Sequence, residues 1–262
     1  MVVFVRCRLQ LPRCTAQSLM TIPLSMGIDW ALPRNVQPEM LDALGAHDSA
    51  AQRSRRDLRR LHRVMGTLGI LLRALDRAVI GAPRSILELG AGDGSMLLRV
   101  AQQRAKRWPA VSVTLLDRQA VVGDHALQGL RDLGWTSTVL TADVFDWLER
   151  PQAAQWDIVI ANLFVHHFSP PALERLLSGI AARTRVFVCC EPRRSAVPLL
   201  CSHAVGLLGA GAVTREDAVL SVHAGFRGQE LSAAWPKRRG WHLHEYSALP
   251  FSHCFVASRD SL

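Results

Sequence analysis

The sequence predicts an α/β protein built on a doubly wound, mostly parallel sheet of seven strands, with an antiparallel strand at one edge. Two observations support this: short β-rich runs alternate with helical patterns from residue 85 onward, and the runs lead into a glycine turn, an acid or a polar loop. Strands joined by helical crossovers run parallel, so their carboxyl ends meet at one edge of the sheet. Because ligands of such sheets bind outside that edge, the functional site is expected there.

A glycine-rich turn follows the first strand run, 85–89. Gly90, Gly92 and Gly94 stand at alternate positions, which lets the backbone turn tightly and bring its N–H groups against a ligand without intervening Cβ atoms. The pattern differs from the dinucleotide-binding fingerprint, because Ser95 stands where that motif needs its third glycine. An NAD-dependent reductase is therefore disfavoured.

Later β-rich runs supply the other strands. The expected strands are 111–117, ending at Asp117; 137–145, containing Asp143; 156–162, leading into the loop 163–168; 186–191, ending at Glu191; and a late pair, 241–246 and 251–257. A carboxylate at the end of the second strand can accept two hydrogen bonds from a ribose diol. We therefore expect the glycine turn and these acids to converge on one ligand.

Helical patterns separate the strand runs. Residues 93–106 and 172–183 carry apolar residues at helical spacing and are expected to be crossover helices, the second following Pro170 and Pro171. No apolar run is long enough to span a bilayer; the mostly apolar stretch 196–213 is expected to form a buried helix.

An arginine-rich segment, 49–80, precedes the sheet. It carries Arg53, Arg55, Arg56, Arg59, Arg60 and Arg63. Leucines at helical spacing predict an amphipathic pair of helices, with Asp48 or Ser49 as the first cap and a break at Gly66 and Gly69. The chain has a formal net charge of +9. The basic face therefore has three interpretations: a solvated face of a docked helix, contact with an anionic membrane, or contact with RNA.

Together these motifs resemble those of the class I S-adenosylmethionine (AdoMet)-dependent methyltransferases, which have a Rossmann-like fold. The resemblance implies AdoMet as cofactor, with Asp117 on the ribose, Asp143 on the adenine amino group and Val144 along the ring. It also implies that the helices before the glycine turn form a lid over the acceptor. The complete set of expected cofactor-binding residues is Glu88, Gly90, Ala91, Gly92, Gly94, Asp117, Arg118, Asp143, Val144, Asn162 and Leu163.

The loop after the fourth strand indicates the acceptor class. Residues 161–168 resemble the corresponding loop of ubiquinone/menaquinone-biosynthesis-type methyltransferases and of their relatives that act on polyketides and lipids. The Asn/Asp-Pro-Pro-aromatic motif of adenine and cytosine amino methyltransferases is absent, and so is a cysteine nucleophile after the fifth strand. The segment 192–240 departs from the quinone enzymes and is interpreted as an acceptor-binding insertion. The predicted function is O- or C-methylation of a small aromatic, polyketide or lipid-like acceptor.

Three residues are candidates for catalysis. His166 and His167 lie on the loop expected to face the methyl group, and a histidine can act as general base on a phenol or enol. Helix capping or packing is the alternative for each. Glu191 is expected either to anchor the acceptor or to order the loop. Weaker candidates are His203, His223 and Arg215, the last pairing with a carboxylate or with Asp217.

The domain prediction has three parts: a poorly defined extension 1–40, a helical lid 41–82 and a core 83–262. Met20 or Met26 is hypothesised to be the true start.

The six cysteines form no CxxC pair, so no metal site is predicted, and a reducing, cytoplasmic compartment is the simplest interpretation. The expected partner is a small-molecule acceptor, with no stable nucleic-acid partner. Peripheral membrane contact, an RNA methyltransferase and a catalytically silent binding protein stay as alternatives, and the oligomeric state is left open.

Overall fold

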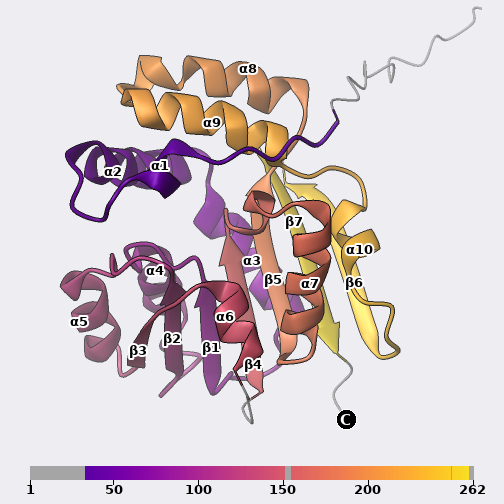
Figure 1. The fold of residues 1–262 in the computed structure, drawn as a ribbon. Helices are drawn as coiled ribbons and strands as arrows, with labels where there is room; N and C mark the ends of the chain where they lie inside the picture. The colour runs from indigo at the N-terminus through magenta and orange to yellow at the C-terminus, as the bar shows by residue number, and fades with distance from the viewer. Residues whose placement is uncertain (1–32, 151–154, 249, 260–262) are drawn as a thin grey trace, which may run out of the picture. The chain divides into compact units, whose positions relative to one another are not determined.

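The computed structural model describes residues 33–150, 155–248 and 250–259, and the hypothesised starts at Met20 and Met26 lie outside them. Within these ranges seven strands form one sheet, in the order β3-β2-β1-β4-β5-β7-β6 (Figure 1). The strands are β1 (Ser85–Leu89), β2 (Ser112–Asp117), β3 (Thr136–Thr141), β4 (Trp156–Asn162), β5 (Thr184–Pro192), β6 (Trp241–Ala248) and β7 (Ser252–Arg259). The predicted fold class, a Rossmann-like α/β sheet, is therefore confirmed.

The first five strands are all parallel, and β7 runs antiparallel to β5. The predicted antiparallel edge is therefore confirmed. The late pair forms an antiparallel hairpin at one end of the sheet, in which β7 pairs with β5 and β6 is the outermost strand.

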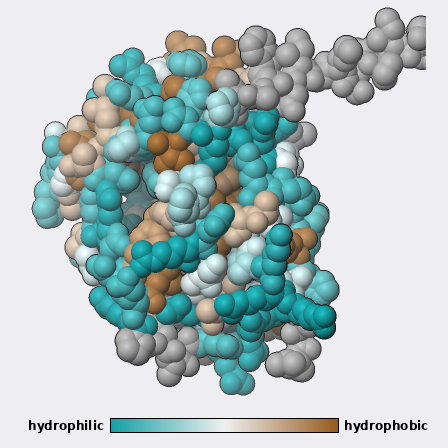
Figure 2. Space-filling model, turned by 45° about the vertical axis from the view of Figure 1, so that its right-hand side comes forward, coloured by the Kyte–Doolittle hydropathy of each residue, from teal (hydrophilic) through white to brown (hydrophobic). Residues whose placement is uncertain are grey.

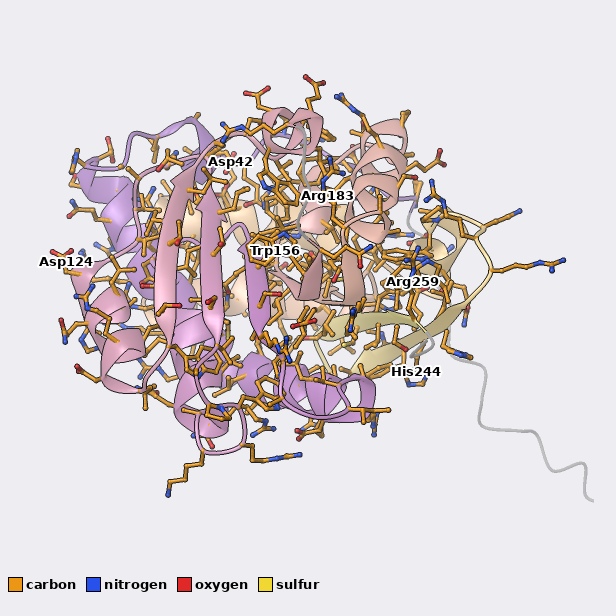
Figure 3. All side chains as sticks on the ribbon, turned by 90° about the horizontal axis from the view of Figure 1, so that it is seen from below. Asp42, Asp124, Trp156, Arg183, His244 and Arg259 are labelled. Atoms are coloured by element: carbon orange, nitrogen blue, oxygen red, sulfur yellow. The ribbon has the colours of Figure 1, made fainter. Side chains whose placement is uncertain are left out.

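Helices cover both faces of the sheet. The helical segments are α1 (Met40–Ala43), α2 (Ser49–Val64), α3 (Thr67–Ala78), α4 (Ser95–Arg104), α5 (Asp124–Asp132), α6 (Val144–Glu149), η1 (Val165–His167), α7 (Pro170–Ala181), α8 (Ala196–Ala204), η2 (Val205–Leu208), α9 (Ala212–Ala224) and α10 (Glu230–Ala234). Apolar side chains of α3, α4 and α5 pack on one face, and those of α6, α7 and α10 pack on the other. In Figure 3, Asp124 of α5 and His244 of β6 mark opposite edges of this layered core.

Local sequence explains several boundaries. Asp48 caps α2, since its Oδ1 accepts hydrogen bonds from the N–H groups of Ala50 (2.7 Å) and Ala51 (3.2 Å). The break before α3 comes at Gly66, which has a φ of 65°, whereas Gly69 lies inside α3. The third strand ends at Thr141 rather than at residue 145, because the side chain of Asp143 caps α6.

Two segments pack differently from the prediction. Helix α3 buries its apolar side against the sheet, so it belongs to the core layer, and α1 and α2 alone form the lid described below. The stretch 196–213 is not one buried helix. Val197, Leu200 and Leu207 are 57%, 73% and 90% exposed, and Figure 2 shows hydrophobic residues gathered at this end of the molecule. None of the helices in the described ranges is long and apolar enough to cross a membrane.

Candidate functional site

A cavity of about 380 Å³ opens at the carboxyl ends of β1, β2 and β4, beneath the lid helices α1 and α2. A hollow in the space-filling view lies between the lid and the sheet (Figure 2). Ten of the eleven predicted cofactor-binding residues line the cavity: Glu88, Gly90, Ala91, Gly92, Asp117, Arg118, Asp143, Val144, Asn162 and Leu163. The structure therefore brings together residues that the sequence distributes over four strand ends.

The glycine turn forms the floor of this cavity. Gly90 and Gly92 have φ values of 65° and 54°, and a Cβ on Gly90 would lie 2.4 Å from the ring of Phe164. A Cβ on Gly92 would instead project into open space, so the backbone there is accessible to a ligand. Gly94 is the one predicted cofactor-binding residue that does not line the cavity. A Cβ built on it would lie 3.1 Å from Ala126 of α5, so glycine at this position allows the turn to pack closely against α5.

Asp117 joins the glycine turn to the end of β2. Its Oδ2 accepts a 2.8 Å hydrogen bond from Gly92 N–H, and its Oδ1 accepts a 2.9 Å bond from Gln119 N–H. Each carboxylate oxygen has a second lone pair, so both can still accept a bond from a diol. Asp143 is more exposed and caps α6 through a 2.7 Å bond from Phe145 N–H, while the neighbouring Val144 is buried.

Three buried polar atoms of residues lining the cavity have no hydrogen-bond partner within the described ranges: His62 Nε2, which lies toward the α2 end, and two side-chain oxygens near the glycine turn. The two oxygens are Oε2 of Glu88 and Oδ1 of Asn162. Buried polar atoms in folded proteins are nearly always satisfied, so these two oxygens indicate a polar ligand. Burial raises the pKa of Glu88 well above its ordinary value, and the charges of Asp93 and Asp117 add to the increase. Glu88 can therefore present a proton as well as an oxygen. Together with Asp117 and the backbone of the glycine turn, these groups fit a nucleoside that carries an amino-acid chain.

Lid arginines tie α2 to this wall. Arg59 Nη1 is 2.7 Å from Asp93 Oδ2, and Arg55 Nη2 donates a 2.7 Å hydrogen bond to Gln119 Oε1. Asp93 belongs to the glycine turn, so part of the basic face of α2 serves to dock the lid.

Glu191 holds the loop after β4 in place. It is fully buried, and its Oε1 accepts 3.1 Å hydrogen bonds from the N–H groups of Phe164 and Val165. Its Oε2 lies 2.7 Å from His166 Nδ1, while His166 Nε2 lies 3.3 Å from Glu39 Oε1 on the other side. Glu191 does not line the cavity. These hydrogen bonds favour the expectation that Glu191 orders the loop over its use as an acceptor anchor or catalytic residue, and both roles stay predictions.

The surroundings of His166 disfavour the general-base role predicted for it. Burial alone would lower its pKa, but hydrogen bonds to Glu191 and Glu39 outweigh burial and raise the pKa to about 9. His166 is therefore an imidazolium near neutral pH, with both ring nitrogens engaged by carboxylates.

His167 is in a different environment on the same turn. Its side chain is 24% exposed, lines the cavity and lies with Nδ1 3.7 Å from Asp42 Oδ2. Burial lowers its pKa, and the positive charge of His166, whose ring centroid is 4.2 Å away, lowers it further. Opposite pKa shifts on adjacent histidines leave His167 neutral and able to accept a proton.

The segment before α1 contributes residues that sequence reasoning missed. Arg34 Nη2 donates hydrogen bonds to the carbonyls of His166 (2.9 Å) and Phe168 (3.0 Å). Glu39 Oε1 accepts a 2.5 Å bond from Ser221 Oγ in addition to its contact with His166. These residues lie in a region predicted to be poorly defined, and no periodic pattern in the sequence marks them.

The insertion contributes little to the cavity wall. Of residues 192–240, Ser221 lines the cavity, whereas His203, His223 and Arg215 do not. Asp217 does not pair with Arg215. Its two carboxylate oxygens accept hydrogen bonds from Met40 N–H (2.7 Å) and Leu41 N–H (3.0 Å), and so attach α1 to α9.

Glu39, His166 and His167 also bring potential metal-ligand atoms within 4.8 Å of one another. The prediction that there is no metal site rested on cysteine spacing and could not detect this group. Because hydrogen bonds to two carboxylates stabilise the protonated form of His166, the arrangement favours an imidazolium there over a metal ligand. The absence of a metal stays a prediction.

The buried ion pairs of His166 predict a pH-dependent stability. Its folded pKa, about 9, is higher than the ordinary 6.5, so its stabilising effect is complete below pH 6.5 and is lost as the pH rises through 9. We expect the difference in unfolding free energy between wild type and His166→Gln to be largest at pH 6 and to shrink by pH 9.5 in urea titrations. His203→Gln, at an exposed position, is the control. A difference that grows with pH would contradict the assignment.

Comparisons with known proteins agree with the fold. Residues 86–185 match a family described as a methyltransferase domain. No curated protein matches this chain significantly. Among solved structures, an O-methyltransferase family protein from Burkholderia thailandensis is 16% identical, with a TM-score of 0.55, over 82% of this chain and 61% of its own. The mitomycin 7-O-methyltransferase is 18% identical, with a TM-score of 0.50, over 81% of this chain and 61% of its own. At such identity the likeness shows the fold, and this chain spans about three-fifths of the length of either protein.

Proposed function

We propose that this chain, whose residues 86–185 form the methyltransferase domain of a class I AdoMet-dependent enzyme, methylates an oxygen or carbon of a small aromatic, polyketide or lipid-like acceptor. The observation that carries the proposal is the convergence of the glycine turn, Asp117 and the unpartnered oxygens of Glu88 and Asn162 on one cavity. AdoMet, when bound, supplies an electrophilic methyl group on a sulfonium.

The cavity wall divides into a cofactor side and an acceptor side. Asp117 would hold the ribose, Asp143 and Val144 the adenine, and the glycine turn with Glu88 the amino-acid portion. The other side carries His167, Phe164 and Phe168. The two phenylalanine rings lie 5.2 Å apart between centroids, which favours a flat, apolar acceptor.

In this proposal His167 is the general base. It takes the proton of an acceptor hydroxyl or enol as that atom attacks the methyl carbon, the carbon–sulfur bond breaks, and S-adenosylhomocysteine and the methylated acceptor result. The imidazolium of His167 then returns its proton to water. His166, Glu191 and Glu39 act as positioning residues, because they fix the turn that carries His167 and keep positive charge beside it. The lid excludes water and aligns the reactants, an effect worth about 7–11 kcal/mol in well-oriented systems.

The alternatives receive less support. An RNA methyltransferase would use the basic face of α2 as its footprint, yet Arg55 and Arg59 are engaged by Gln119 and Asp93. A silent binding protein has no need for unpartnered polar atoms in the cofactor cavity. The proposal also includes a cytoplasmic setting and a role in secondary metabolism. Cys190 and Cys254 support the cytoplasmic setting, because they face each other across β5 and β7 and are free thiols, as expected in a reducing compartment.

Substitution at the two cofactor acids tests the proposal. We expect Asp117→Ala to weaken S-adenosylhomocysteine binding by roughly a hundredfold, because two hydrogen bonds to a charged acceptor are lost, and Asp143→Ala to weaken it far less. Isothermal titration calorimetry measures both. Asp117→Asn, which keeps the side-chain shape, separates the loss of charge from disturbance of the glycine turn. Equal affinities for wild type and Asp117→Ala would remove Asp117 from the site.

A further inference from the structure

A second concave surface lies outside the cofactor cavity, where α2 ends and α3 begins. Arginines from three helices line this basic groove: Arg63 of α2, Arg73 of α3 and Arg99 of α4. The other lining residues are His62, Met65, Gly66, Leu68, Gly69 and Ile70, so no acidic side chain lines it. Three guanidinium groups without a carboxylate create a local excess of positive charge.

These arginines lack the ion pairs that several neighbouring arginines form. Arg59, Arg60 and Arg104 form ion pairs with Asp93, Asp57 and Asp76. Over the part of the chain that the structure describes, Arg63, Arg73 and Arg99 form neither an ion pair nor a side-chain hydrogen bond. Within the described residues, the groove thus gathers three arginines whose charges no carboxylate compensates.

Backbone and imidazole donors add to the groove. Helix α3 starts after Gly66, which offers no side chain to cap its first N–H groups. A Cβ built on Gly69 would lie 3.4 Å from Arg73 Nη1, so this guanidinium lies beside the first turn of α3. His62 lines both the groove and the cofactor cavity, and its Nε2 is buried without a partner among the described residues. Burial lowers the pKa of His62 to about 4, and Arg99 contributes in the same direction, so the ring is a neutral donor or acceptor.

We propose that the basic groove binds the phosphate group of a small ligand or of a lipid headgroup. Arginine is suited to this role, because its planar, permanently charged fork donates two parallel hydrogen bonds to phosphate oxygens. Amide N–H groups at the start of α3 would supply further donors. The proposal does not rest on methyl transfer: the arginines and α3 do not line the cofactor cavity, and His62 is the one groove residue that lines both.

The test uses the full chain and pyrophosphate as the probe for a free phosphate ligand. We expect saturable binding by calorimetry, weakened roughly ten- to hundredfold by Arg99→Gln and by Arg63→Gln. Arg56→Gln is the matched control, because Arg56 is exposed on α2 and does not line the groove. Unchanged affinity for S-adenosylhomocysteine in all three variants verifies that the fold and the cofactor site are intact.

A second arm identifies the source of the phosphate. Phosphatidylcholine vesicles with and without phosphatidic acid are sedimented with wild type and with the same variants. Binding of vesicles containing phosphatidic acid that is lost in Arg99→Gln but kept in Arg56→Gln supports a lipid headgroup; pyrophosphate binding alone supports a free ligand. No binding in either arm, binding of RNA alone, or equal losses in Arg99→Gln and Arg56→Gln would overturn the proposal.

Discussion

His167→Ala is expected to lower the rate of methyl transfer by about 10²–10⁴-fold, the usual contribution of a positioned general base. Burial and the neighbouring imidazolium of His166 lower the pKa of His167, so the base is neutral and ready to accept a proton near pH 7. Cofactor affinity should not change, because the predicted ribose and adenine contacts come from Asp117, Asp143 and Val144.

Formation of S-adenosylhomocysteine over a panel of phenols and enolisable diketones measures this effect. At the acidic end of the pH profile, the wild-type rate should rise with pH as His167 loses its proton. The rate of His167→Ala should not show this rise. His203→Ala, at an exposed position outside the cavity, is the matched control. Turnover and pH profile that match wild type in His167→Ala would end the general-base role.

Glu191→Ala is expected to reduce the free energy of unfolding by about 3–5 kcal/mol, the usual cost of removing one partner of a buried ion pair. The fully buried carboxylate binds His166 Nδ1 at 2.7 Å and also accepts the N–H groups of Phe164 and Val165. The backbone N–H of His166 also donates to this carboxylate at 3.3 Å, so loss of the carboxylate leaves a buried imidazolium and three backbone donors without their acceptor.

Urea unfolding of wild type, Glu191→Ala and Glu191→Gln separates these contributions. The glutamine variant keeps one carbonyl oxygen for the N–H groups of Phe164 and Val165 and loses the charge, so its stability should lie between the other two. A Glu191→Ala variant within about 1 kcal/mol of wild type would contradict the view that this side chain anchors the loop.

Local patterns were enough to predict the sheet and the convergence of the glycine turn and Asp117 on one cavity. The glycine turn and Asp117 lie at strand ends, and parallel strands necessarily gather such ends at one edge. The sequence could not show that Gly90 lines the cavity and Gly94 does not. Their surroundings are set by residues from elsewhere in the fold, Phe164 beside Gly90 and Ala126 beside Gly94.

The surroundings of the two histidines were harder to predict, because they depend on distant contacts. Glu39 reaches His166 across 127 residues, and Asp217 reaches Met40 across 177. Neither contact has a periodic signal in the sequence. The adjacent histidines were identical in local pattern, and only their tertiary partners give them opposite pKa shifts. The prediction of a buried helix over 196–213 was wrong for a related reason, since hydrophobicity alone does not distinguish a buried helix from an exposed one.

Thermal unfolding with S-adenosylhomocysteine tests the central claim most directly, with NAD as the control. At about a hundred times its dissociation constant, S-adenosylhomocysteine should stabilise the fold by roughly 2.7 kcal/mol, which raises the unfolding temperature by roughly 5–10 °C in a chain of this size. NAD should leave the unfolding temperature unchanged. A folded protein that shows no shift with S-adenosylhomocysteine, or a shift with NAD alone, would contradict the assignment of this cavity to AdoMet.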